Sequence, residues 1–108
     1  MSGYLLIESR DPLDSADSTH YYGLATTLAR QGGPVTLFLV QNGVFPARPS
    51  ASTARLEAMI RAGVEVLADD FSLRERGIPL DRLPAGVAPA PIDTVIDRLL
   101  EGRKALWH

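Results

Sequence analysis

The chain has 108 residues, of which 45% are hydrophobic and 22% charged, and its formal net charge is −2. This length fits one domain, residues 1–108. Basic residues do not cluster into a stripe that would bind a phosphate backbone, so we expect no nucleic-acid partner. The sequence contains no cysteine, which excludes thiolate nucleophiles, zinc–thiolate sites and iron–sulfur clusters within the chain.

The first half of the chain predicts a strand, a helix and a second strand. Residues 4–9 form a short apolar run with little alternation, which is typical of a strand covered on both faces. A helix is expected to begin at residues 15–18 and to end before Gly32. The apolar run at residues 35–40 indicates the second strand. The predicted buried face of the helix, at i, i+3, i+4 spacing, is Tyr21, Leu24, Ala25, Leu28 and Ala29.

The middle of the chain continues the alternation. Residues 41–52 are rich in glycine and proline and are expected to form a loop. A second helix is predicted over residues 52–62, with Leu56, Met59 and Ile60 facing inward. The apolar run at residues 64–68 indicates a third strand.

The last third predicts one more strand–helix–strand unit. Residues 71–77 suit a short helix, and a short strand is expected near Val87 in an otherwise irregular segment. The final helix is expected to start at Pro91, a good first helical residue, and residues 103–108 are expected to form the closing strand, with Trp107 packed at the sheet edge. The predicted buried stripe of this helix is Ile92, Val95, Ile96, Leu99 and Leu100.

Strands separated by single helices predict an α/β fold with parallel pairing. We expect a three-layer sandwich with a mostly parallel sheet of four to five strands. The N-terminal residues lack the features of a signal peptide and no apolar run has membrane-spanning length, so we expect a cytoplasmic protein with no membrane partner. Ligands in such sheets lie at the carboxyl ends of the strands, here the loops at 9–18, 41–50 and 69–78.

Two adjacent aspartates stand at the end of the third predicted strand. Asp69 and Asp70 fit helix N-caps or first-turn acids. Alternatively one of them enters a cleft and contacts a cation or a polar ligand, since neighbours on an extended chain point to opposite sides. Arg74 and Arg76 fit solvated or paired side chains, or an anion clamp.

Other candidates lie in the first two loops. His20 is either an exposed side chain or a ligand contact near the cleft. Asn42 and Gly43 suit a turn, and they also lie where a backbone amide can face a ligand. Tyr22 and Phe45 are candidate interface residues because aromatic side chains are enriched at subunit contacts.

A receiver-like site is an alternative interpretation of the acidic residues. Glu8 and Asp11 after the first strand, with Asp69 after the third, resemble carboxylates that hold a magnesium ion around a phosphoacceptor. Receiver domains also place a lysine at the carboxyl end of the last strand, whereas Lys104 stands at the start of that strand.

Three segments carry a resemblance to a known family. "VTLFLVQNGVFPAR" (35–48), "GVEVLADDFSLRERGI" (63–78) and "IDTVIDRLLEGRKALWH" (92–108) resemble, in order and spacing, the second strand and loop, the third strand and active loop, and the last helix and strand of the DsrE/DsrF-like family.

The resemblance implies a small flavodoxin-like domain that assembles into a homotrimer or homohexamer. Many such proteins act in sulfur trafficking, and a cysteine just after the third strand carries a persulfide in the active ones. Counting back from "RGI" (76–78) places that position at about Asp69, with Ala68 or Asp70 as the alternatives if the loop differs in length. A carboxylate lacks sulfur chemistry.

We therefore expect a non-catalytic DsrE-like oligomeric subunit or small-ligand-binding module that needs no cofactor. A cysteine-bearing DsrE-like protein or a sulfur-transfer protein is a candidate partner. The alternative is a carboxylate-based enzyme, or a receiver-like phosphoacceptor, that uses Asp69 or Asp70 with a divalent cation.

Overall fold

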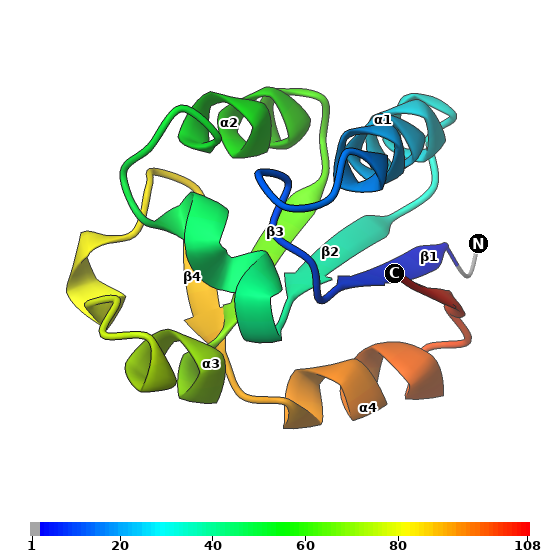
Figure 1. Ribbon diagram of the computed structural model, residues 1–108. Helices are drawn as coiled ribbons and strands as arrows, with labels where there is room; N and C mark the ends of the chain where they lie inside the picture. Colours follow the sequence, from blue (N-terminus) through cyan, green and yellow to red (C-terminus); the bar gives the residue numbers. More distant parts are fainter. Residues whose placement is uncertain (1–2) are drawn as a thin grey trace.

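The computed structural model describes residues 3–108, and its centre is a five-stranded, all-parallel sheet (Figure 1). The strands lie in the order β4-β3-β2-β1-β5, so the last strand joins the sheet beside the first. Among the described residues, no helix combines the length and the apolar composition that a bilayer span requires. The strands are β1 (Tyr4–Glu8), β2 (Val35–Leu39), β3 (Glu65–Asp69), β4 (Val87–Ala90) and β5 (Lys104–Trp107).

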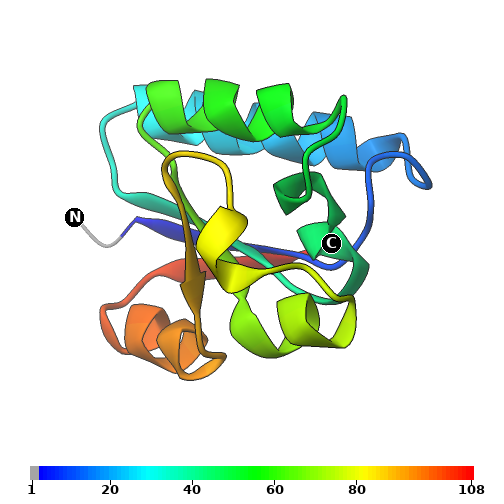
Figure 2. The same cartoon turned by 90° about the vertical axis from the view of Figure 1, so that its left-hand side faces the viewer.

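Helices cover both faces of this sheet and complete a three-layer α/β sandwich (Figure 2). The layer on one face holds α1 and α2, and the layer on the other holds α3 and α4. The predicted fold class, including the parallel sheet, is confirmed. The helices are α1 (Asp17–Arg30), α2 (Thr53–Arg61), α3 (Asp70–Glu75) and α4 (Asp93–Leu100).

The two faces of the sheet are packed unequally. The larger core lies under α1 and α2, where Leu6, Leu37 and Val66 from three strands meet Leu56 and Met59 of α2. The opposite face carries a small cluster, to which α4 contributes one partly buried side chain, Val95. The buried members of this small cluster are Leu5, Ile7, Phe38, Leu67 and Ala90.

Local structure departs from the sequence prediction at two places. The sequence predicts a loop over residues 41–52, but the 3-10 helix η1 (Gln41–Ala47) occupies most of that segment. A second 3-10 helix, η2 (Leu80–Arg82), precedes β4. The buried face of α1 is also rotated from the predicted one. Tyr22 is 4% exposed and lies in the core, whereas Leu24 is 39% exposed.

The predicted buried stripe of the last helix is wrong. Ile92, Ile96, Leu99 and Leu100 are all exposed, and of the predicted stripe only Val95 packs on the sheet. Trp107, expected to pack at the sheet edge, is 67% exposed.

A polar network explains the orientation of α4. The buried hydroxyl of Thr36 on β2 donates a hydrogen bond to Glu65 Oε1 at 2.6 Å. Arg98 of α4 donates to the same carboxylate from Nε (3.2 Å) and Nη2 (3.0 Å), and Arg103 Nη1 donates to Thr36 Oγ1 at 2.7 Å. The helix therefore turns Arg98 toward the sheet, which leaves most of its apolar side chains on the outside.

The charge of Glu65 depends on this network. Partial burial raises the pKa of the Glu65 carboxyl, but the hydrogen bonds from Thr36 and Arg98 and the charges of Arg98 and Arg103 together outweigh burial. The pKa therefore lies below its ordinary value of 4.5.

We expect Glu65→Gln to lower the free energy of unfolding at neutral pH by about 1 kcal/mol, since it removes a partly exposed ion pair. Because the folded-state pKa is depressed, the contribution is complete above pH 4.5 and is lost as the pH falls through the folded-state pKa. Chemical denaturation across this pH range measures the difference.

The matched control is Glu57→Gln on α2, because Glu57 forms no ion pair within residues 3–108. We expect this variant to match the unmodified protein at every pH. An effect of Glu65→Gln that stays constant down to strong acid would contradict the network.

Candidate functional site

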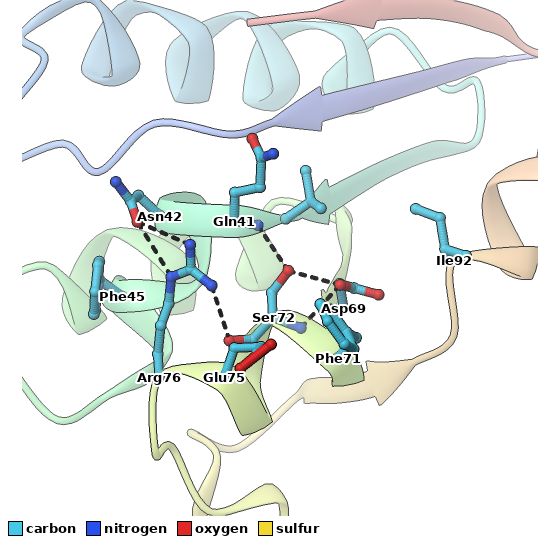
Figure 3. Close-up of a pocket in the computed structure, with 10 residues that line it drawn as sticks. Gln41, Asn42, Phe45, Asp69, Phe71, Ser72, Glu75, Arg76 and Ile92 are labelled. Carbon is cyan, nitrogen blue, oxygen red and sulfur yellow. Dashed lines mark hydrogen bonds between the residues drawn. The ribbon is translucent and has the colours of Figure 1, made fainter.

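A cavity of about 800 Å³ opens at the carboxyl ends of β2 and β3 (Figure 3). Its walls come from η1, from α3 and from the residue before α4, three segments that are distant in the sequence. This is the edge where ligands of parallel α/β sheets bind. The lining residues are Val40, Gln41, Asn42, Phe45, Asp69, Phe71, Ser72, Glu75, Arg76 and Ile92.

Asp69 forms the floor of the cavity and caps α3. Its Oδ2 accepts hydrogen bonds from the Ser72 backbone N–H (3.0 Å) and the Ser72 hydroxyl (2.6 Å). The residue is 4% exposed. This arrangement is the helix N-cap that the sequence analysis kept open as one role for the aspartate pair.

Ser72 also connects the floor of the cavity to its rim. The same hydroxyl that donates to Asp69 accepts a hydrogen bond from the Gln41 backbone N–H at 2.8 Å. Gln41 adopts a left-handed backbone conformation, with φ of 55°, which is uncommon for a residue with a side chain. The hydroxyl thus fixes a strained residue at the start of η1.

Arg76 closes one side of the cavity through fixed contacts. Its Nε and Nη2 donate to Asn42 Oδ1 at 3.2 and 3.0 Å, and its Nη1 donates to the Ser72 carbonyl at 3.3 Å. The guanidinium carbon also lies 5.8 Å from the centre of the Phe45 ring, which Arg48 approaches at 4.9 Å. The side chains of Asn42 and Phe45 are therefore held in place.

The cavity does not include every residue proposed for it from the sequence. Asp70 and Arg74 form an i, i+4 ion pair at 3.9 Å, and neither lines the cavity. Gly43 is buried, and its amide donates to the Val40 carbonyl at 3.0 Å. The Gly43 amide is therefore engaged within the protein, which agrees with the turn role and not with the alternative role of facing a ligand.

His20 lies at a different hollow, near the carboxyl ends of β1 and β5. This shallow hollow is lined by Asp17, His20, Tyr21, Leu24 and His108 and shares no residue with the cavity. Burial, reinforced by the negative charge of Glu8, raises the pKa of the Tyr21 phenol, which donates a 2.6 Å hydrogen bond to the Leu106 carbonyl. His20 is therefore not brought together with Asp69 and Asp70.

The acidic residues of the receiver-like alternative are engaged elsewhere. Glu8 is fully buried, where it accepts a hydrogen bond from the Arg10 backbone N–H and lies 2.9 Å from His108 Nδ1. Asp11 accepts from the Leu13 backbone N–H. Within residues 3–108, no group of three or more histidine, aspartate or glutamate side chains is arranged to hold a metal ion.

Six of the ten residues that line the cavity could not be named as candidates from the sequence. Only the folded chain brings them together, although each lies in a segment that resembles the family. These residues are Val40, Gln41, Phe71, Ser72, Glu75 and Ile92. Tyr22 was proposed as an interface residue, but its side chain lies in the core under α1 and offers no surface to a neighbouring subunit.

Comparison with known proteins identifies a family match over nearly the whole chain. The DsrE/DsrF-like family profile matches residues 3–107. No curated protein sequence matches the chain.

Solved structures share the fold at low sequence identity. The ychN protein from E. coli has a TM-score of 0.84 and 22% identity, covering 98% of this chain and 99% of that one. The protein of unknown function MTH1491 from Methanobacterium thermoautotrophicum has 0.81 and 18%, covering 97% and 96%. BT1422 from Bacteroides thetaiotaomicron, also of unknown function, has 0.77 and 15%, covering 97% and 94%.

We expect Gly43→Ala to lower the free energy of unfolding by roughly 2–4 kcal/mol. A Cβ atom at this position would lie 2.1 Å from the Glu8 carbonyl oxygen, so β1 and η1 would have to separate. Thermal or chemical denaturation measures the loss.

Gly23→Ala is the control, because a Cβ atom there meets nothing within 4 Å. Gly23 lies on an exposed part of α1, and alanine in a helix is favoured over glycine by about 0.5–1 kcal/mol. Equal effects of the two substitutions would show that the close approach at Gly43 is not a constraint.

Proposed function

Because the chain belongs to the DsrE/DsrF-like family, we propose that it is a non-catalytic subunit of a homotrimer or homohexamer that binds a small ligand and carries no persulfide. The family relates it to sulfur metabolism, and a cysteine-bearing DsrE-like protein or a sulfur-transfer protein is the partner we propose. Its cytoplasmic location stays a prediction of the sequence.

The observation that carries this proposal is the state of Asp69. It stands at the end of β3, where the family resemblance places the sulfur-accepting cysteine, and it is a buried N-cap with one oxygen bound to Ser72. A carboxylate cannot form a persulfide, which needs a nucleophilic thiolate. The cavity is thus present at this position, but the residue there has no thiol that could carry sulfur.

An exposed apolar surface supports the proposed assembly. Six of the nine large hydrophobic side chains that are exposed in residues 3–108 lie in α3, in α4 and its N-cap, or at Trp107 of β5, on the same side of the sheet. Monomeric proteins rarely leave such a concentration uncovered, and interfaces are built from it. The residues of this surface, called the α4 face below, are Phe71, Ile92, Ile96, Leu99, Leu100 and Trp107.

No observation favours the enzymatic alternative. Asp70 pairs with Arg74, and His20 lies at another hollow. In the part of the chain that the structure describes, no cluster of carboxylates surrounds Asp69 to hold a divalent cation.

We expect the intact mass of the purified protein to stay unchanged after incubation with polysulfide. The variant Asp69→Cys should gain mass under the same conditions, because it restores a thiol beside the cavity. Mass spectrometry before and after reduction measures both. A reducible sulfur adduct on the unmodified chain would overturn the proposal, and an inert Asp69→Cys variant would show that the acceptor position lies at another residue.

We expect light scattering to give the mass of a trimer or hexamer for the unmodified protein. Ile96→Lys places a charge on the α4 face and should shift the population toward the monomer, since burying an unpaired charge is strongly unfavourable. Leu24→Lys, an exposed apolar position on α1 in the opposite layer, is the control and should leave the mass unchanged. A monomeric unmodified protein at micromolar concentration would contradict the assembly.

A further inference from the structure

We propose that the cavity above Asp69 selects a small organic ammonium ion with an apolar, preferably aromatic, body. This inference rests on the proposed ligand-binding function and names the chemical class of the ligand. It follows from the walls of the cavity, from the free oxygen of Asp69 and from the way Arg76 is held.

The walls favour a compact apolar body. Val40, Phe45, Phe71 and Ile92 line the cavity, and the two aromatic rings come from different segments, η1 and α3. Phe71 and Ile92 are exposed, so part of the apolar wall lies open at the mouth. A volume of about 800 Å³ is within the range of small-molecule sites.

The floor supplies a buried acceptor. The hydrogen bonds of Asp69 to Ser72 all use Oδ2, whereas Oδ1 has no hydrogen-bond partner among residues 3–108. Figure 3 shows the two oxygens, one bound to Ser72 and the other pointing away from it. The residue is 4% exposed and lines the cavity, so a donor inside the cavity can reach this oxygen. A carboxylate binds a charged donor more strongly than a neutral one.

The charges around the cavity favour a cation over an anion. Asp69 and Glu75 contribute two carboxylates, and Arg76 is the one cationic side chain among the lining residues. The Arg76 guanidinium donates to Asn42 and to the Ser72 carbonyl from all three nitrogens, so its fork is directed at the protein. The first turn of α3 is also capped by Asp69, which removes the usual attraction of a helix N-terminus for anions.

Three probes of similar shape test the charge preference on the assembled protein: 2-phenylethylamine, 2-phenylethanol and 3-phenylpropanoate. Titrations followed by backbone amide shifts of η1 and α3 give the dissociation constants. We expect the ammonium to bind about tenfold more tightly than the alcohol and the carboxylate to bind most weakly, because a charge-assisted hydrogen bond exceeds a neutral one by about 1.4 kcal/mol.

Two isosteric variants locate the acceptor. Asp69→Asn keeps a good N-cap for α3, removes the negative charge and should weaken ammonium binding by about tenfold while leaving the alcohol unchanged. Asp70→Asn removes the same charge from the next residue, which does not line the cavity and pairs with Arg74. It should alter ammonium binding by less than about twofold, because this charge is partly neutralised by its partner and screened by solvent.

The outcomes separate this inference from the function on which it rests. Equal or tighter binding of the carboxylate, or an unchanged ammonium affinity in Asp69→Asn, would overturn the ammonium proposal and leave a ligand-binding subunit. If none of the probes shifts the amides of η1 and α3, both the inference and the ligand-binding part of the proposed function fail. The oligomeric mass of the ligand-free protein tests the assembly in a separate measurement.

Discussion

The hydroxyl of Thr36 is the group on which the orientation of α4 in the α3 and α4 layer depends. It is fully buried in β2, it donates to Glu65 on β3, and it accepts from Arg103 just before β5, while Arg98 of α4 reaches the same carboxylate. One residue thus joins two strands, a helix and the approach to the last strand. A polar network anchored at a buried hydroxyl selects one orientation among several that apolar packing would accept. Here it fixes the rotation of α4 about its axis.

The order of strands and helices could be predicted from the sequence because it depends on local patterns, such as the apolar run of β2 and the positive-φ glycines Gly32 and Gly63 after α1 and α2. The orientation of α4 could not, because its periodicity is equally strong whether the stripe faces the sheet or the solvent. That choice is made by Arg98 and its tertiary partners. The 3-10 helix η1 escaped prediction because it contains glycine and proline and lacks the 3.6-residue period.

For the site, the sequence identified the strand ends and residues at them, including Asn42 and Asp69, since parallel strands deliver their loops to one edge. Phe45, which also lines the cavity, was predicted only as an interface residue. The sequence did not identify Phe71 or Ile92, which belong both to the cavity wall and to the α4 face. Ligand binding and subunit association therefore use neighbouring surface. In the proposed oligomer, the neighbouring subunit lies close to the mouth of the cavity, so its occupancy and the assembly state are expected to influence each other.

The hydroxyl of Ser72 has a mechanical consequence. It accepts a hydrogen bond from the Gln41 backbone N–H and donates one to Asp69 Oδ2. Three residues from two segments therefore form one continuous chain of hydrogen bonds. The position of the Asp69 carboxylate is therefore linked through this hydroxyl to the left-handed residue that starts η1. The η1 wall of the cavity and Asp69 are thus coupled through one oxygen atom, that of the Ser72 hydroxyl.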